Sequence, residues 1–148
     1  MRPDPSRVLG GVAQTLAAQL ARETKTPFGA YLATIAAGLT GTMAVEIERI
    51  ADRLYRENKA LLALLTEAAL LAGESLRTQI QAAASLADPP NLLVSTLVAA
   101  NDRLRFLLIE VHSDIESQTS EAARSVDQRI WDELRESTRR RHVGIGAY

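Results

Sequence analysis

The sequence ENKALLALLTEA at residues 57–68 decides the fold class, and it returns in altered form as ANDRLRFLLIEV at residues 100–111. Both stretches contain the pattern Asn-x-x-Leu-x-x-Leu-Leu-x-Glu, which begins at Asn58 and at Asn101. At about 100° per residue, an α-helix places the asparagine and the leucines of each copy toward one face. The repeat therefore predicts two amphipathic helices, each with an amide inside its apolar stripe.

Flanking residues extend both apolar stripes beyond the repeat. The stripes consist of Leu54, Asn58, Leu61, Leu65, Ala68 and Ala72 in the first copy, and of Leu97, Asn101, Leu104, Leu108, Val111 and Ile115 in the second. A buried amide without a hydrogen-bond partner is costly, so we expect the two asparagines to meet each other across an antiparallel pair, or to meet their symmetry mates. They would then fix the helix register. Two alternatives remain: the repeat is a chance match, or the two amides hold a polar ligand between them.

The composition favours closely packed helices. Of the 148 residues, 47% are hydrophobic but only 4% are aromatic. A core of alanine, leucine, isoleucine and valine suits helices better than a pleated sheet. The sequence therefore predicts an all-α protein, an antiparallel helical bundle of four to six helices with one long interrupted helix. A single domain is expected over residues 1–142, followed by a tail at residues 143–148.

Charge and cysteine content exclude several classes of protein. The formal net charge of −1 provides no field that would gather nucleic acid, and the absence of cysteine excludes disulfides and thiolate metal sites. The first residues, MRPDPSRVLGG, lack the apolar core of a secretory signal. We therefore expect a cytoplasmic protein that binds no nucleic acid.

Residues 26–45 carry no charge and are long enough to span a membrane. They are rich in threonine and glycine, and Glu46 and Glu48 follow them where basic residues would favour a membrane segment. We therefore expect a helix that is buried on most sides and no membrane span. Ala33, Ala37 and Gly41 would let a neighbouring backbone approach closely.

Glycine, proline and capping residues predict where helices begin and end. A first helix is expected over residues 6–24, and breaks are expected at residues 38–41 and at Gly73, where glycine disfavours the helix by about 1 kcal/mol. The sequence LADPPN predicts a firmer break, after which Asp88 would cap a helix over residues 89–116. A last helix is expected from about residue 119, with three arginines at its end that offset the helix dipole.

The residues do not form a recognisable catalytic or metal-binding pattern. A carboxylate-bridged metal site in a bundle uses Glu-x-x-His, whereas Ile109 stands three residues before His112. His112, Ser113 and Asp114 splay apart around a helix, so they cannot form a catalytic triad. We therefore expect no catalytic residue, no metal and no cofactor, and we expect His112 to be partly buried with a local hydrogen bond.

These observations favour a non-catalytic helical bundle that self-associates, as a dimer or higher oligomer, and acts as an interaction or scaffold protein. Phe106 and Ile109 lie away from the main stripe of their helix, and together with Trp131 they are the candidate interface. The alternative is a small-molecule-binding or enzymatic bundle with a polar pocket between its helices. The candidate pocket residues are Tyr31, Tyr55, Asn58, Asn101, Arg105 and His112. A lipid-surface protein is a third class.

Two short segments resemble parts of known families. LLALLTEAALLAGE at residues 61–74 resembles the first helix of the small all-helical chorismate mutases, but Ala68 stands where that family has an arginine for a substrate carboxylate. The tail VGIGAY resembles the C-terminal peptides that load cargo into encapsulin shells, although it ends in Ala-Tyr where a small residue and leucine are usual. The second resemblance implies a shell-encapsulated cargo protein that docks on its partner through Val143, Ile145 and Tyr148.

Overall fold

The structure, a computed structural model, describes residues 4–142, apart from the side chain of Ala87. All regular structure in this range is helical, which confirms the prediction of an all-α protein. The chain divides into two compact units, which hold residues 4–50 (unit 1) and residues 51–142 (unit 2). The folding of residues 1–142 as one domain stays a prediction, and the tail residues Val143, Ile145 and Tyr148 lie outside the described range.

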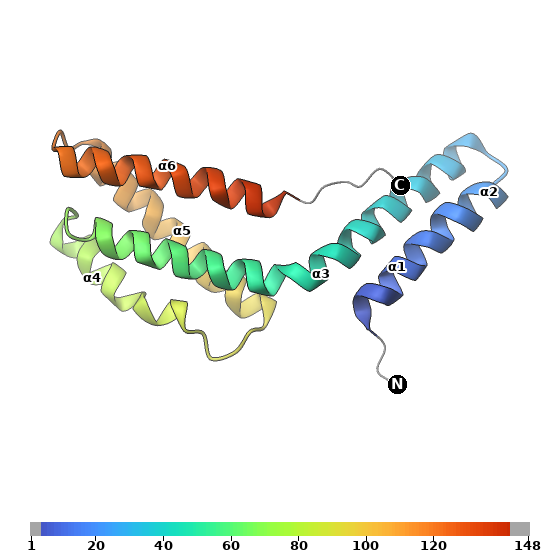
Figure 1. Ribbon diagram of the computed structural model, residues 1–148, viewed down its shortest axis with the longest axis horizontal. Helices are drawn as coiled ribbons and strands as arrows, with labels where there is room; N and C mark the ends of the chain where they lie inside the picture. Colours follow the sequence, from blue (N-terminus) through green and yellow to red (C-terminus); the bar gives the residue numbers. More distant parts are fainter. Residues whose placement is uncertain (1–3, 143–148) are drawn as a thin grey trace. The chain divides into compact units, whose positions relative to one another are not determined.

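Unit 1 is a helical hairpin (Figure 1). Its first arm is a continuous helical rod made of α1 (Pro5–Thr15), the π-helical stretch η1 (Leu16–Leu20) and α2 (Ala21–Glu23). The second arm is the first part of α3 (Pro27–Ala68). Asp4 caps the first arm by accepting a hydrogen bond from the backbone N–H of Ser6 at 3.0 Å. The hydroxyl of Thr26 does the same for the N–H of Gly29 at 3.1 Å, so each arm begins at a side-chain cap.

α3 is a single helix of 42 residues, about 63 Å long, and it passes through Gly38 and Gly41 without a break. The predicted interruption at residues 38–41 is therefore wrong. A glycine disfavours the helix by only about 1 kcal/mol, which a long run of helix-forming neighbours outweighs. The predicted break near Gly73 is confirmed, because α3 ends at Ala68 and α4 (Glu74–Ala82) begins directly after that glycine.

The uncharged segment at residues 26–45 is poorly buried within this chain, since half of its residues are exposed. Only Ala33, Ala37 and Gly41 of unit 1 are buried among the described residues, and they form the small-residue stripe expected from the sequence. Only 17% of the most apolar 18-residue window of α3 is buried, and by length and composition α3 could cross a membrane. The expectation of a helix buried on most sides is wrong for the single chain, because a hairpin covers each arm from one direction.

Unit 2 packs helices around a core rich in leucine. Its elements are the second part of α3 (51–68), α4, the 3-10 turn η2 (Ala84–Ala87), α5 (Val94–Glu116) and α6 (Glu121–Arg141). Every residue of the two predicted stripes is buried, and Leu65, Leu97 and Leu104 are completely inaccessible to solvent. The predicted stripes are therefore confirmed.

The two copies of the repeat run parallel to each other. At one end of the pair the side chain of Asn58 donates to the carbonyl of Leu97, and at the other end Gln118 donates to the carbonyl of Leu71 at 3.1 Å. Residue numbers therefore rise in the same direction along α3 and α5 (Figure 1). The predicted antiparallel pairing of the copies is wrong, because α4 and η2 carry the chain back before α5 begins.

α6 runs antiparallel to α3, since Arg141 pairs with Glu57 at one end and Arg129 pairs with Glu67 toward the other. Its N-cap is Ser120, whose hydroxyl accepts from the N–H of Ala123 at 3.1 Å, close to the predicted start. These contacts close the bundle of unit 2 around the parallel pair.

α5 begins at Val94 and not at residue 89 as predicted. Asp88 does not cap it, because this carboxylate forms an ion pair with Lys59 at 3.4 Å. Instead, the side chain of Asn91 accepts a hydrogen bond from the N–H of Leu93 at 3.0 Å and holds the chain extended up to the first turn.

Gly29 and Gly38 of α3 differ in the space around them, and alanine substitutions at the two positions test the geometry of the hairpin. A methyl group at Gly38 would meet no atom within 4 Å, so Gly38→Ala should stabilise the local helix by about 1 kcal/mol and slow amide exchange at residues 34–42 about fivefold. A methyl group at Gly29 would overlap the methyl group of Thr24, whose hydroxyl is held by the carbonyl of Leu20 at 2.6 Å. Gly29→Ala should therefore not slow amide exchange. Equal slowing of amide exchange by both substitutions would contradict this geometry.

Candidate functional site

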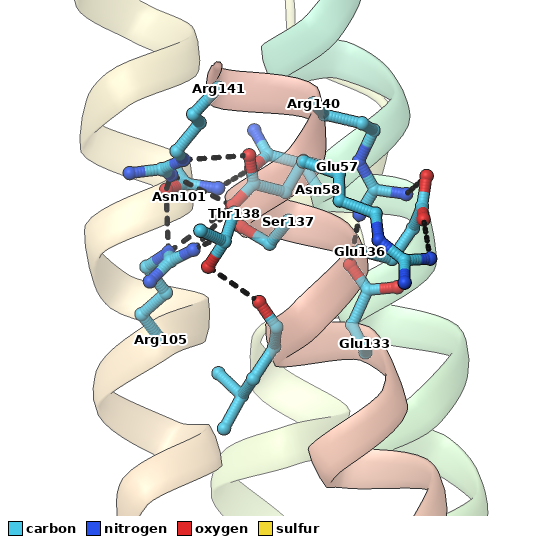
Figure 2. A network of polar contacts seen from close by, with 12 residues as sticks. Glu57, Asn58, Asn101, Arg105, Glu133, Glu136, Ser137, Thr138, Arg140 and Arg141 are labelled. Carbon is cyan, nitrogen blue, oxygen red and sulfur yellow. Dashed lines mark hydrogen bonds and ion pairs between the residues drawn. The ribbon is translucent and has the colours of Figure 1, made fainter.

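A group of polar side chains is buried where α3, α5 and α6 of unit 2 meet (Figure 2). α3 contributes Glu57 and Asn58, α5 contributes Asn101 and Arg105, and α6 contributes Ser137 and Arg141, which together are called the Glu57 network. The side chain of Glu57 is 0% exposed, whereas those of Arg105 and Arg141 are 32% and 43% exposed. The network therefore has an inaccessible carboxylate at its centre and two cations that reach solvent.

The carboxylate of Glu57 accepts hydrogen bonds from both other helices. Its Oε1 atom lies 2.7 Å from Arg105 Nη2, 2.8 Å from Arg141 Nη2 and 2.9 Å from Ser137 Oγ. Its Oε2 atom accepts a longer bond of 3.4 Å from Arg141 Nε. The hydroxyl of Ser137 also accepts from Arg105 Nη2 at 2.6 Å while it donates to Glu57. All donors to this carboxylate therefore come from α5 and α6.

The two asparagines of the repeat join this arrangement. Asn101 donates from Nδ2 to Oδ1 of Asn58 at 2.8 Å, and Asn58 donates to the backbone carbonyl of Leu97 at 3.0 Å. Oδ1 of Asn101 in turn accepts from Arg105 Nε at 3.2 Å and from Arg141 Nη2 at 3.0 Å. The amides thus connect the α3–α5 contact to the cations that neutralise Glu57, and the amide atoms that take part are all paired.

The electrostatics of the network keep Glu57 ionised. Burial raises the pKa of Glu57, but the hydrogen bonds from Arg105, Arg141 and Ser137 together outweigh burial and lower the pKa to about 2. A buried carboxylate without these partners would cost several kcal/mol, so the charge requires both arginines to be in place. The network therefore links the stability of unit 2 to the mutual position of three helices.

A second carboxylate group lies next to the network on α6. Burial raises the pKa of Glu133, while the neighbouring guanidinium of Arg140 opposes this shift, and the pKa remains above its usual value. Arg140 also lies 3.9 Å from Glu136 (Figure 2). These contacts tie the last turns of α6 together beside the buried carboxylate.

The chemistry available to the Glu57 network is that of a structural clamp. A carboxylate with a pKa near 2 is a weak base, and its oxygens are already engaged by donors. The hydroxyl of Ser137 donates to this carboxylate at 2.9 Å, and a base this weak activates a hydroxyl poorly as a nucleophile. The geometry supports helix positioning better than catalysis.

The structure brings together three of the six candidate pocket residues. Asn58, Asn101 and Arg105 belong to the Glu57 network, but Tyr55 instead lies beneath the ammonium group of Lys59, 5.1 Å from its ring centroid. His112 contacts Asp127 at 2.7 Å through its Nε2 atom. Tyr31, the further residue of the predicted pocket, belongs to unit 1 and is 62% exposed.

A hollow with a volume of about 670 Å³ lies beside the start of α5, and its position tests the pocket hypothesis further. It is lined by Ser85, Leu86, Asp88, Pro89, Pro90, Ser95, Thr96, Ala99 and Ala100. None of the six candidate pocket residues lines it. Asn58, Asn101 and Arg105 instead form hydrogen bonds with one another in the Glu57 network.

The candidate interface residues are exposed on unit 2. Phe106 and Ile109 of α5 are 52% and 69% exposed, and Trp131 of α6 is 44% exposed. The guanidinium group of Arg103 lies over the ring of Phe106 in a cation–π contact, with its central carbon 5.9 Å from the ring centroid. Trp131 packs edge-on against the ring of His112. These side chains are available to a partner, as expected for residues outside the main stripe.

Three residues of the network did not stand out in the sequence. Glu57 is next to the repeated asparagine but looks like one of many helical glutamates, and Ser137 and Arg141 lie within an ordinary basic helix end. One signal was present: the repeat offset of 43 residues aligns Glu57 with Ala100 and Arg105 with Leu62. Glu57 and Arg105 are thus among the charged residues that differ between the two copies, and they are the pair that meets in the structure.

Comparison with known proteins gives no relative for this chain: no family model, no curated protein and no solved structure matches it.

The low pKa of Glu57 predicts a pH-dependent contribution to stability. Its pKa falls from a usual value of 4.5 to about 2 in the folded chain, so the unfolded chain takes up the proton first as the pH falls. The stabilisation by this carboxylate is complete above about pH 4.5 and is lost as the pH falls toward about 2. The free energy of unfolding of the natural chain should therefore exceed that of Glu57→Gln at neutral pH, and the difference should shrink by roughly 3 kcal/mol at about pH 2.

Urea unfolding followed by circular dichroism between about pH 2 and 7 measures this difference. Glu67→Gln is the matched control, because Glu67 also pairs with an arginine of α6 but is 38% exposed. Its effect should stay within about 0.5 kcal/mol over the same range. A difference for Glu57→Gln that does not change with pH would contradict the assigned pKa.

Proposed function

We propose that this protein is a non-catalytic helical interaction protein that associates with itself, and that unit 1 provides the contact surface. Of the nineteen large hydrophobic residues that are exposed in the described chain, eleven lie in unit 1 and eight in unit 2. Unit 1 contains only about a third of the described residues. This concentration of exposed apolar side chains is the observation that carries the proposal.

The exposed apolar side chains of unit 1 lie on both arms of the hairpin. They are Val8, Val12, Leu20, Phe28, Tyr31, Leu32, Ile35, Leu39, Met43, Val45 and Ile47. α1, η1 and α2 contain no buried residue at all. Because a hairpin of two helices has too little interior to bury its own apolar surface, these side chains require a covering partner.

A second copy of the hairpin satisfies this requirement. Two hairpins that pack through their apolar faces form a four-helix arrangement, which buries each arm from more than one direction. The charge distribution supports an apolar partner of this kind, since residues 8–21 and residues 26–45 contain no charged side chain. An exposed surface without charge offers nothing to an acidic or basic partner but fits a copy of itself.

Unit 2 differs from unit 1 because it has its own closed core. Fifteen buried apolar residues form one cluster across its helices, and the Glu57 network fixes how α3, α5 and α6 meet. Unit 2 therefore buries most of its apolar surface within the single chain. This contrast supports a division of labour in which unit 2 is the stable part and unit 1 is the part that associates.

A lipid bilayer is the second candidate partner of the same surface. The apolar window of α3 has a mean hydropathy of 1.4 and is long enough to cross a membrane. Two threonine hydroxyls of this part of the helix are satisfied inside it, since Thr34 and Thr40 donate to the carbonyls of Ala30 and Ala36. Lipid and a second copy predict different behaviour in buffer, where only the second copy produces a soluble oligomer.

Two charges introduced into the hairpin should separate the copies. Leu32 and Leu39 are 48% and 62% exposed and lie two helical turns apart on one side of α3, so Leu32→Asp with Leu39→Asp should leave the single chain folded. At about 10 µM we expect the natural chain to sediment as a dimer or larger and this variant to sediment as a monomer, because an unpaired carboxylate in the interface costs several kcal/mol.

The control introduces the same charges in unit 2, as Leu70→Asp with Leu92→Asp, at positions that are 78% and 64% exposed. This variant should still associate. A natural chain that sediments as a monomer would overturn the proposal, and so would an equal loss of association in the control. Flotation of a monomeric natural chain with neutral phosphatidylcholine vesicles would then identify lipid as the partner.

A further inference from the structure

Three potential metal ligands converge between α5 and α6, away from the Glu57 network. They are Nε2 of His112, a carboxylate oxygen of Glu116 and a carboxylate oxygen of Asp127, and the three atoms all lie within 4.8 Å of one another. The imidazole is largely buried, with 16% of its side chain exposed, whereas the side chains of Glu116 and Asp127 are 57% and 34% exposed. The cluster is therefore rooted in the bundle but open to solvent on one side.

The local geometry follows from helix periodicity and from the antiparallel α5–α6 pair. His112 and Glu116 are four residues apart on α5, so their side chains share one face, and Nε2 lies 3.5 Å from Oε1 of Glu116. Asp127 approaches from α6 and places Oδ1 2.7 Å from the same nitrogen. Two helices thus supply one nitrogen and two oxygen ligands.

These distances are compatible with a bound transition-metal ion. Zinc lies about 2.0–2.2 Å from nitrogen and carboxylate oxygen ligands, which places tetrahedral ligand atoms about 3.4 Å apart. The spacing between His112 and Glu116 already has this value. The carboxylate of Asp127 would move outward by about 0.7 Å, which its partial exposure permits.

The charge balance of the cluster also favours a cation. Within the described residues, the carboxylates of Glu116 and Asp127 lie within 4 Å of the His112 imidazole, and neither forms an ion pair with a lysine or an arginine. Several other carboxylates of unit 2 pair with an arginine, as Glu57 does with Arg105 and Glu67 does with Arg129. Two carboxylates that share one imidazole therefore lack the positive charge that a divalent ion would supply.

We propose that His112, Glu116 and Asp127 bind a divalent transition-metal ion of the zinc class. Imidazole and carboxylate ligands suit Zn²⁺, Co²⁺ and Ni²⁺, and three protein ligands leave a coordination position for water. The edge-on contact of Trp131, whose ring centroid lies 5.4 Å from that of His112, fixes the orientation of the imidazole. The expectation of no metal site rested on the absence of Glu-x-x-His, whereas this cluster combines His-x-x-x-Glu with an aspartate from another helix.

Trp131 provides a direct readout, because it is the only tryptophan of the chain and contacts the proposed ligand His112. In tag-free protein, Ni²⁺ should quench its fluorescence in a saturable manner with one ion per chain, and Zn²⁺ should displace the nickel. Calorimetric titration with Zn²⁺ should give the same stoichiometry. The absence of saturable binding up to millimolar metal would overturn the proposal.

Matched substitutions assign the ligands. Glu116→Gln and Asp127→Asn keep the shape of each side chain, and each should weaken the binding of Zn²⁺ at least about tenfold while the circular dichroism spectrum stays unchanged. His142→Ala is the control, because His142 is the only other histidine and is exposed at the end of α6. Undiminished affinity in both carboxylate variants, or an equal loss in the His142 variant, would show that the metal binds elsewhere and would refute the site.

Discussion

Unit 2 depends on the need to neutralise one buried carboxylate. Glu57 is inaccessible to solvent and ionised, and an isolated charge in that position would destabilise the bundle by several kcal/mol. Its two cations come from α5 and α6, 48 and 84 residues further along the chain. The charge is therefore stabilised only when α3, α5 and α6 are in one axial register, so that Arg105 and Arg141 both reach Glu57. The buried carboxylate is thus a strong constraint on helix register.

The repeated segment takes on a specific meaning in this setting. In a parallel helix pair, equivalent positions face each other, and Asn58 faces Asn101 as the equivalent asparagines of a parallel coiled coil would. The copies are not identical, because Glu57 and Arg105 break the equivalence and introduce a charge pair across it. The leucines thus hold α3 and α5 together by apolar packing. The charged residues that differ between the copies determine which side chains α6 must supply, namely Ser137 and Arg141.

Sequence periodicity predicted the features that depend on local chemistry. The buried stripes follow from leucine spacing, and the start of α6 follows from the cap at Ser120, because both are set within a few residues. Helix direction was predicted wrongly, since an apolar stripe is the same whichever way a helix runs, and the return through α4 decides it. The sequence did not indicate the role of Glu57, because its partners are distant in sequence. It also did not indicate that α3 continues through Gly38, because the helix penalty of a glycine is local whereas the stability of the helix depends on its whole length.

The position of Arg141 has a consequence for how the chain acquires its structure during synthesis. α3 and α5 leave the ribosome well before the last turn of α6, which supplies the second cation for Glu57. At about 5–20 residues per second, several seconds separate translation of Glu57 from that of its final partner. During this interval a docked α3–α5 pair would hold Glu57 with Arg105 alone. Completion of unit 2 therefore waits for the end of its last helix, and the nascent chain remains without its full clamp until that moment.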